Sequence, residues 1–296
     1  MIYPWLSEIE QQLSTSLRTG RFHHAQLFNG QQGVGKTAMV EQLADALLCQ
    51  QPSNIKACGQ CKSCQLNQAG THPDKFNVQV EGQSIGVDEI RTVSDFMSHS
   101  AAQNGNKVVI IKDCHKMTTA AANALLKTLE EPSPQRFLLL TTTTATQLPA
   151  TILSRCSRTD VQVSDTDSTQ QWLASLQIID YPWLSLFYQQ PLLVQAWQQA
   201  DQLTTIEQLY KFATSLKQGH NFSELVDIIN KDSELIRVFC LFVSDQLKQQ
   251  LVSGMQFDAY QQAQQALTEF YQNSTQVLGL NLPLAVSRLA YSLRNG

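Results

Sequence analysis

The stretch Gly30-Gln31-Gln32-Gly33-Val34-Gly35-Lys36-Thr37 matches the pattern G-x-x-x-x-G-K-[ST] in full. It follows a short apolar run at residues 25–28 that predicts a β-strand, and it precedes residues 38–48, whose apolar side chains recur at helical spacing. In this order, strand, glycine-rich turn and helix form a loop whose backbone N–H groups surround phosphate oxygens at the positive end of the helix. The stretch therefore predicts an α/β fold with a nucleotide-binding phosphate loop.

Each residue type in this loop has an expected role. Gly30, Gly33 and Gly35 allow the backbone to close around the phosphates. Lys36 is expected to pair with the β- and γ-phosphates, and the Thr37 hydroxyl is expected to bind Mg²⁺. These five residues are the predicted nucleotide-binding site. A chance glycine-rich turn is the alternative, which the flanking strand and helix disfavour.

Short apolar strands alternate with helical patterns over roughly the first 160 residues, which predicts a parallel sheet covered by helices. Beyond the elements around the loop, the pattern predicts strands at 76–80, 107–111 and 137–140 and helices at 87–97 and 120–129. From about Val161 the strand patterns end, and periodic apolar residues predict helices alone. The chain is thus expected to continue from an α/β part into an all-helical part.

Hydrolysis of a bound nucleotide needs acidic residues at the end of a second buried strand. Here the run ends in Lys112-Asp113-Cys114-His115, whereas AAA+ ATPases often carry Asp-Glu-x-His. Aligned on His115, Lys112 takes the position of the Mg²⁺-binding aspartate and Asp113 that of the catalytic glutamate. A shift by one residue restores the aspartate but places Cys114 at the catalytic position. Either alignment lacks one carboxylate, which predicts negligible hydrolysis, unless Lys112 points to solvent and the acid lies elsewhere.

Four of the seven cysteines lie within sixteen residues of each other: Cys49, Cys58, Cys61 and Cys64. Two overlapping C-x₂-C steps bring thiolates close together on a tight turn, and the cysteine at the preceding helix end can supply a fourth corner. Four thiolates without an open position are typical of a structural Zn²⁺ site. An iron–sulfur cluster and free thiols are the alternatives. The other three cysteines are expected to be ordinary buried thiols: Cys114, Cys156 and Cys240.

Composition limits the class of protein. Hydrophobic residues make up 43% and charged residues 16% of the 296 residues, which suits a globular protein. No apolar run reaches the ~18 residues that span a membrane, and the N-terminus lacks the pattern of a secretion signal. We therefore expect a cytoplasmic protein without membrane contact. The net charge of −4 disfavours a protein that coats nucleic acid through bulk electrostatics.

Taken together, the motifs resemble the bacterial clamp-loader subunits of DNA polymerase III. Their order is the phosphate loop, the cysteine cluster, Thr71-His72-Pro73-Asp74, the Asn-Ala-Leu-Leu-Lys-Thr-Leu-Glu-Glu-Pro run at 123–132, and Ser154-Arg155-Cys156. The resemblance is dense over residues 20–160 and faint after that. It implies a RecA-like AAA+ P-loop core with a zinc module, a small helical lid and an all-α collar for oligomerisation. The expected bounds are 1–160 for the core, with the zinc insertion at 49–64, then 161–203 for the lid and 204–296 for the collar.

Within this family the chain looks like the stator rather than the gamma/tau motor. The motor has the same zinc cysteines but an intact Asp-Glu pair and a sensor arginine in its lid, where residues 189–193 of this chain carry none. The resemblance implies that Arg155 acts in trans as an arginine finger on the ATP of a neighbouring motor subunit. Pairing of Arg155 with a local acid such as Asp160 is the alternative, and Arg158 is a nearby arginine for comparison. The intact loop leaves static binding of ATP or ADP with Mg²⁺ open.

The resemblance also implies partners. The expected assembly is a hetero-pentamer with delta and gamma/tau subunits, which places the β sliding clamp on primed DNA within the DNA-directed DNA polymerase III holoenzyme. The chain would be a non-hydrolysing subunit, although the sequence leaves open whether it is an enzyme by itself. An independently active ATPase like the motor subunit and a zinc-ribbon protein that binds nucleic acid are the alternatives.

Overall fold

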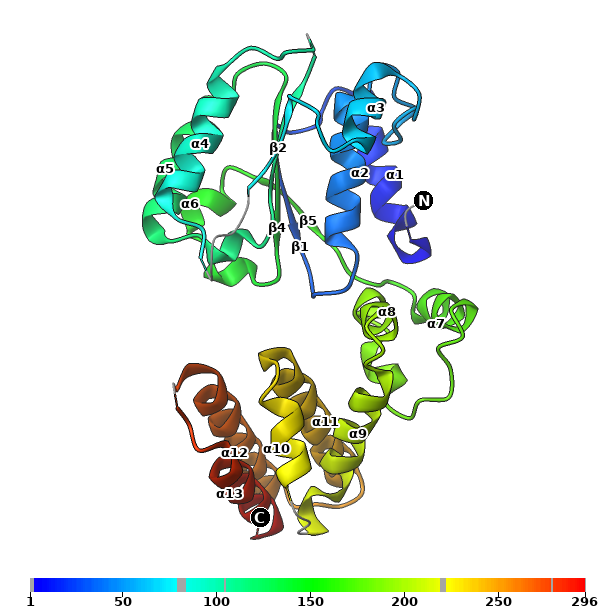
Figure 1. Cartoon of the computed structure of the whole chain (residues 1–296), viewed down its shortest axis with the longest axis vertical. Coiled ribbons are helices and arrows are strands. Elements are labelled where there is room, and N and C mark those ends of the chain that lie inside the picture. Colours follow the sequence, from blue (N-terminus) through cyan, green and yellow to red (C-terminus); the bar gives the residue numbers. More distant parts are fainter. Residues whose placement is uncertain (1–2, 79–83, 104, 219–221, 278, 296) are drawn as a thin grey trace. The chain divides into compact units, whose positions relative to one another are not determined.

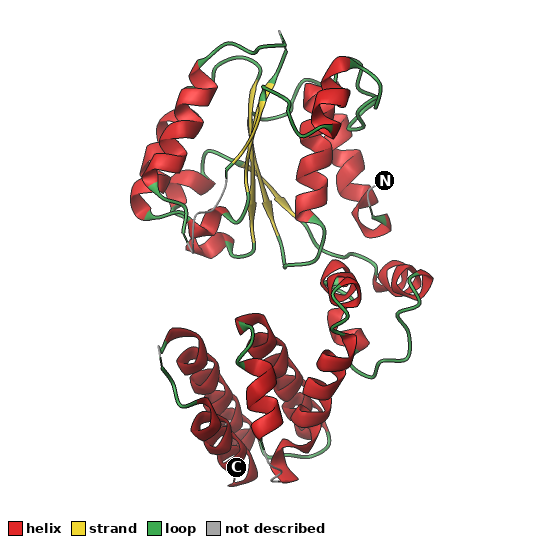
Figure 2. Ribbon diagram, in the orientation of Figure 1, coloured by secondary structure: helices red, strands yellow, loops and turns green. Residues whose placement is uncertain are grey.

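The computed structural model describes residues 3–78, 84–103, 105–218, 222–277 and 279–295. The chain forms two compact units (Figures 1 and 2). The first contains residues 1–177 and 187–193, and the second contains residues 178–186 and 194–296. Among the described helices, none combines the length and the apolar character that crossing a bilayer requires.

A parallel sheet of five strands, in the order β2-β3-β4-β1-β5, forms the centre of the first unit. Its strands are β1 (Ala25–Asn29), β2 (Lys75–Asn77), β3 (Lys107–Ile111), β4 (Arg136–Thr142) and β5 (Ser157–Asp160). The strands predicted at 25–28, 107–111 and 137–140 are confirmed. The strand predicted at 76–80 is confirmed as the shorter β2, and residues 79 and 80 lie outside the described residues. The sequence does not predict β5, because Ser-Arg-Thr-Asp is polar and this strand lies at the edge of the sheet.

Helices cover both faces of this sheet. They are α1 (Ser7–Arg18), α2 (Lys36–Leu48), α3 (Lys62–Gln68), α4 (Val87–Ser98), α5 (Thr119–Glu130) and α6 (Ala150–Leu153), whereas α7 (Thr166–Ser175) packs on the N-terminal turn, where the ring of Trp172 meets those of Tyr3 and Trp5 edge-on. In Figure 1, α1, α2 and α3 lie on one side of the strands and α4, α5 and α6 on the other. Alternate residues of β3 serve the two faces: Val108 and Ile110 pack with the α2 side, and Val109 and Ile111 pack with the α4 and α5 side.

The predicted helices of the first unit are confirmed with small changes at their ends. The helix predicted at 120–129 is α5, which begins after Thr118, whose hydroxyl accepts a hydrogen bond from the backbone N–H of Ala121 at 3.2 Å. It ends two residues before Pro132, which cannot continue a helix. In α4, Val93 is buried with its neighbours at helical spacing, as the periodicity predicts.

The second unit is helical, as predicted. Its complete helices are α9 (Leu203–Ser215), α10 (Ser223–Ile229), α11 (Ser233–Val252), α12 (Phe257–Gln276) and α13 (Leu282–Asn295), and α8 (Pro191–Gln199) passes from the first unit into it. After Asp160 the described residues contain no strand. Phe239 and Phe242 of α11 are fully buried, and Phe242 meets the ring of Tyr210 edge-on with centroids 5.3 Å apart.

The division into two units crosses the predicted lid. Residues 161–177 and 187–193 belong to the first unit, whereas 178–186 and 194–203 belong to the second. The bounds of core, lid and collar at 1–160, 161–203 and 204–296 stay predictions.

Candidate functional site

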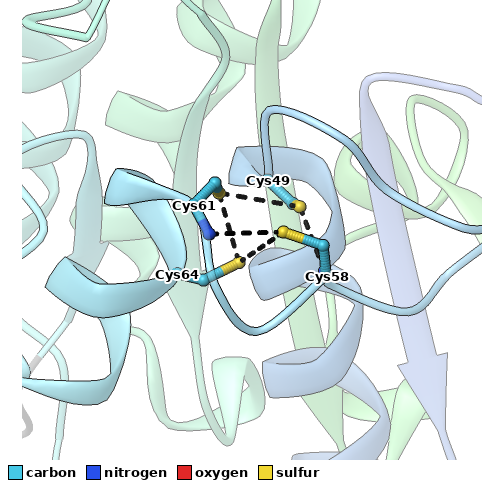
Figure 3. Close-up of side chains that lie close together, drawn as sticks. All are labelled: Cys49, Cys58, Cys61 and Cys64. Atoms are coloured by element: carbon cyan, nitrogen blue, oxygen red, sulfur yellow. Dashed lines mark hydrogen bonds between the residues drawn. The ribbon is translucent and has the colours of Figure 1, made fainter.

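Two elements and one loop position the clustered cysteines (Figure 3). Cys49 directly follows α2, Cys61 directly precedes α3, and Cys64 lies in the first turn of α3. Cys58 lies in the loop between the two helices, three residues before Cys61. Gly59 has a φ of 78°, a left-handed conformation that permits the tight turn between these two cysteines.

The four sulfur atoms all lie within 4.8 Å of one another. The Sγ–Sγ distances are 3.9 Å for Cys49–Cys61, 3.9 Å for Cys58–Cys64 and 3.4 Å for Cys61–Cys64. A disulfide requires about 2.05 Å, so these are separate thiols. A tetrahedron of sulfurs about 2.3 Å from a central Zn²⁺ has edges of about 3.8 Å. The cluster therefore has the chemistry and the spacing of a closed four-thiolate metal site.

Backbone N–H groups surround this cluster. Those of Gln51 and Cys58 donate to Sγ of Cys49 at 3.4 and 3.2 Å, and that of Cys61 donates to Sγ of Cys58 at 3.4 Å. Backbone hydrogen bonds lower the pKa of Cys58, whereas burial raises the pKa of Cys64. Burial likewise raises the pKa of Cys49, so the backbone donors favour the thiolate, which is the form that binds a metal ion, at Cys58.

A buried polar chain connects the cysteine segment to the sheet. Nε2 of His72 lies 3.0 Å from Oγ of Ser63 in α3, and Nδ1 of His72 accepts the backbone N–H of Asp74 at 3.0 Å. The Asp74 carboxylate accepts the N–H groups of Ala102 at 2.7 Å and Gln103 at 2.9 Å. Because Nδ1 is an acceptor, Nε2 carries the proton and donates to Ser63. This tautomer cannot activate the serine as a nucleophile, so these hydrogen bonds have a structural role and not a catalytic one.

The phosphate loop lies at the opposite end of α2. The helix begins at Lys36, and Gly33 and Gly35 have φ values of 77° and 111°. A Cβ atom at Gly33 would lie 2.8 Å from Cβ of Leu193, and one at Gly30 would collide with the carbonyl oxygen of Val161. The backbone path and the close neighbours therefore require glycine at these positions.

A cavity of about 460 Å³ opens beside this loop. Its lining comes from the loop, the start of α2, the ends of β3 and β4, and one later residue: Gln32, Gly33, Gly35, Lys36, Thr37, Ala38, Asp113, His115, Lys116, Thr141, Thr143 and Leu192. Four of the five predicted nucleotide-binding residues are among them. Gly30 lines a neighbouring pocket together with Gln31 and Val34.

Within the cavity, Lys36 is held by its own loop. Its ammonium donates to the carbonyl oxygens of Gly30 and Gln31, both at 2.7 Å. Burial lowers the pKa of Lys36 to about 8, although the negative charge of Asp113 opposes the shift. An anion in the cavity would offer the ammonium a charged partner in place of two neutral carbonyls.

The end of β3 distinguishes between the two alignments of the acidic residues. Asp113 lines the cavity, whereas Cys114 is fully buried in the apolar cluster on the α4 and α5 side. The alignment that places Cys114 at the catalytic position is therefore wrong. Lys112 is half exposed rather than free in solvent, because its Nζ lies 2.8 Å from Oε1 of Glu41 in α2. The geometry agrees with the alignment on His115.

The segment at 189–193, which carries no arginine at the place of the family's sensor residue, reaches the phosphate loop. The backbone N–H of Leu192 donates to the carbonyl oxygen of Gly33 at 2.9 Å, and Leu192 lines the cavity. An apolar side chain thus contacts the cavity from this segment.

Arg155 follows α6 and is absent from the described lining of the phosphate-loop cavity. Its Nη2 lies 2.6 Å from Oε1 of Glu130, and its Nη1 donates to the carbonyl oxygen of Thr151 at 3.0 Å. Arg158 pairs with Asp160 at 2.8 Å. Arg155 thus pairs with an acid of its own chain, as the alternative expects, but that acid is Glu130 rather than Asp160, which pairs with Arg158.

The remaining cysteines are largely as predicted. Cys114 and Cys240 are buried and Cys156 is partly buried. Burial raises the pKa of Cys156 to about 11 and that of Cys240 to about 12, so both stay protonated at neutral pH.

The sequence does not predict the acidic partners of Lys112 and Arg155, which are Glu41 and Glu130. Glu41 lies four residues after Thr37 and so shares a face of α2 with it, a spacing that is visible in the sequence. Glu130 pairs with an arginine twenty-five positions away in the chain, and no local pattern indicates that contact.

The comparisons with known proteins agree on one family. The family model described as DNA polymerase III, delta subunit, matches residues 5–165. The chain is 39% identical over 180 residues to DNA polymerase III subunit delta' of Haemophilus influenzae, an alignment that covers 60% of this chain and 55% of that protein. It is 45% identical over 156 residues to subunit delta' of Escherichia coli K12, covering 52% and 47%. The chain thus spans about half the length of these curated relatives.

More distant likenesses involve another subunit type. Subunit tau of Escherichia coli K12 is 35% identical over 161 residues, covering 54% of this chain and 25% of tau. Among solved structures, a DNA polymerase III gamma subunit-related protein from Thermotoga maritima aligns over 96% of this chain and 99% of its own, with a TM-score of 0.56 and 20% identity. That last likeness concerns the fold alone.

Proposed function

The chain belongs to the DNA polymerase III delta subunit family, and we propose that it is the delta'-type stator of a clamp-loader complex. In this role it assembles in the cytoplasm with delta and gamma/tau subunits into a hetero-pentamer, which places the β sliding clamp on primed DNA. The identities to delta' subunits of 39% and 45%, against 35% for tau, support the stator over the motor. Residues 1–160 supply the AAA+ P-loop core, residues 161–203 the lid and residues 204–296 the collar.

The observation that carries this proposal is a phosphate loop without its acidic counterpart. Among the described residues that line the cavity, Asp113 is the only carboxylate. Lys112 takes the position of the Mg²⁺-binding aspartate, and its ammonium pairs with Glu41. A site with this composition can hold phosphates through Gly30, Gly33, Gly35, Lys36 and Thr37, but it lacks the pair of carboxylates that ATPases use. We expect static binding of ATP or ADP.

For catalysis in a neighbouring subunit, the proposed contribution is Arg155. A guanidinium stabilises the charge that develops on a transferring γ-phosphate, and such fingers raise rates by about 10³–10⁵-fold. Arg155 would exchange the Glu130 carboxylate for the phosphate. The pair is partly exposed, and exposed ion pairs contribute only about 0–1 kcal/mol, so this exchange is inexpensive.

The proposed role of Cys49, Cys58, Cys61 and Cys64 is to hold one structural Zn²⁺. The spacing of their sulfur atoms supports this assignment. Bound zinc would stabilise the loop between α2 and α3 and take no part in phosphate chemistry.

The decisive experiment is reconstitution with delta, gamma/tau and the β clamp. Arg155→Ala should leave assembly intact but reduce clamp-dependent ATP hydrolysis and clamp loading, by less than the 10³-fold of a dissected finger because the ring has other active sites. Arg158→Ala is the matched control and should change both rates little, because its guanidinium is paired with Asp160. Wild-type loading by Arg155→Ala, or failure of that variant to assemble, would contradict the finger role.

The intact phosphate loop favours one further candidate, an independently active ATPase like the motor subunit. An ATPase assay on the chain alone separates the two functions. Steady turnover that Lys36→Ala abolishes would establish the motor activity, whereas binding without turnover supports the stator.

A further inference from the structure

The position in which P-loop ATPases hold Mg²⁺ does not fit that ion in this chain. We infer that the phosphate loop binds its nucleotide, a nucleoside di- or triphosphate, as an anion free of divalent metal. The inference rests on the nucleotide site of the proposed function and adds the chemical form of the ligand. It is carried by the charges around the C-terminal end of β3 and the first turns of α2.

Lys112 lies where the metal-binding carboxylate is expected. Val108 and Ile110 of β3 face α2, and Lys112 continues this alternation toward the same helix, where it meets Glu41 at 2.8 Å. Glu41 is one helical turn after Thr37, whose hydroxyl is the expected Mg²⁺ ligand. The residue at this position thus supplies no carboxylate, and its ammonium pairs with Glu41 one helical turn from Thr37.

Glu41 cannot replace the missing acid, because both of its oxygens are engaged. Oε1 pairs with Lys112, and Oε2 lies 3.0 Å from Nζ of Lys75, which also contacts Asp45 at 2.8 Å. Burial alone would raise the pKa of Glu41, but the hydrogen bonds from the two lysines outweigh it and lower the pKa. These two acids and two bases compensate each other and leave no net negative charge for a divalent cation.

Asp113 is the remaining acid, and cations flank it. Its Oδ2 lies 3.3 Å from Nζ of Lys116, and its charge acts on Lys36. Its backbone is left-handed at a φ of 50°, and its N–H donates to Oγ1 of Thr141 at 3.1 Å. Two lysines thus surround one carboxylate in the cavity lining.

These charges favour binding of the metal-free nucleotide over binding of its Mg²⁺ complex. Mg²⁺ is usually held by one or two carboxylates in addition to the phosphates, and it demands near-octahedral oxygen geometry. Here two lysines of the cavity, Lys36 and Lys116, can neutralise phosphate charge directly. A divalent cation would instead meet these two lysines and a single carboxylate, Asp113, which already lies 3.3 Å from Nζ of Lys116.

The test is nucleotide binding by the full chain with and without metal, measured by calorimetry with ADP and with ATP. The dissociation constant in excess EDTA should be lower than that in excess Mg²⁺, because Mg²⁺ competes with the protein for the free nucleotide. Equal or tighter binding in excess Mg²⁺ would overturn the inference while leaving the nucleotide site intact. Absence of binding under both conditions would contradict the nucleotide site itself.

A pair of variants tests the residue assignment. Lys112→Asp restores a carboxylate and should make ADP binding metal-dependent, with about tenfold tighter binding in Mg²⁺. Lys112→Ala is the matched control, which removes the ammonium without adding an acid and should bind ADP no more tightly in Mg²⁺ than in EDTA. Electron paramagnetic resonance with Mn²⁺ and ADP reports the metal directly. A protein-bound Mn²⁺ signal is expected for Lys112→Asp alone, and the same signal from the wild-type chain would overturn the inference.

Discussion

The two ends of α2 carry two sites of opposite character. At its C-terminal end, four like residues from one short segment, 49–64, come together completely. At its N-terminal end, the cavity draws on the phosphate loop, the ends of β3 and β4, and Leu192. There the phosphate-binding half is intact, while one of the two expected acids is replaced by Lys112, which pairs with Glu41.

This difference follows from how the sites are assembled. The cysteine ligands depend on one another, because losing a single thiolate leaves a closed metal site incomplete. The halves of the cavity serve separable tasks: glycines and Lys36 bind phosphate, while carboxylates support metal and hydrolysis. A site built from distant segments can therefore keep binding and lose catalysis.

The largest effect is expected from Cys61→Ser. Structural zinc contributes folding free energy directly, so loss of one ligand should cost several kcal/mol, of the order of half the ~10 kcal/mol of a zinc-finger site, and loosen residues 49–70. Hydrogen exchange of that segment and elemental analysis measure the two effects. Cys156→Ser is the control and should retain one zinc per chain. Wild-type protein with less than about half an equivalent of zinc, or with stoichiometric iron and visible colour, would contradict the site.

At the other end of the helix, Lys36→Ala should weaken ADP binding by about a hundredfold, because it removes a buried charge-assisted contact to phosphate. Zinc content should be unchanged, since the cysteines lie at the opposite end of α2. Calorimetry and elemental analysis on the same sample check both. Lys116→Ala, which removes a more exposed lysine of the cavity, should weaken binding much less. Equal losses for the two variants would mean that the loop geometry does not select Lys36.

His72→Ala tests whether the cysteine segment depends on its connection to the sheet. The change leaves Ser63 and the N–H of Asp74 without their buried partner, which should cost about 2 kcal/mol of unfolding free energy. Chemical denaturation measures that loss, and competition with a chelator should show weaker zinc retention. The exposed His99 provides the control substitution, His99→Ala. Equal unfolding free energy and equal zinc retention in the two variants would show that the hydrogen bonds of His72 do not support the cysteine cluster.

The smallest effect concerns pH and is confined to the cavity. Lys36 has a pKa of about 8 in the free chain, and a bound phosphate favours its charged form and raises that pKa. Nucleotide affinity should therefore be constant below pH 8 and fall above it, by up to about tenfold per pH unit. Binding titrations across this range measure the slope. Lys36→Arg should bind without this dependence, because a guanidinium stays charged, and a persistent slope in that variant would assign the titration to another group.

The sequence alone predicted those strands, helices and motifs whose signal lies in residues close together in the chain. Buried strands such as β3 appear as continuous apolar runs, and the helical spacing in α4 matches its buried face. The phosphate loop and the cysteine cluster are determined by spacing over eight and sixteen residues, because a short chain segment limits how far its side chains can separate. The edge strand β5 escaped this reasoning because its polar residues carry no apolar signal.

Only the tertiary structure decided which charges meet. Spacing showed that a carboxylate is missing beside Lys112, but not that Glu41 pairs with it, nor that Arg155 is held by Glu130 instead of Asp160. The role of His72 likewise became visible only when α3 and the start of β2 came together. Such contacts join residues that packing of the sheet and its helices brings near. Ion pairs also form between any opposite charges that come within reach, so the local sequence does not specify their partners.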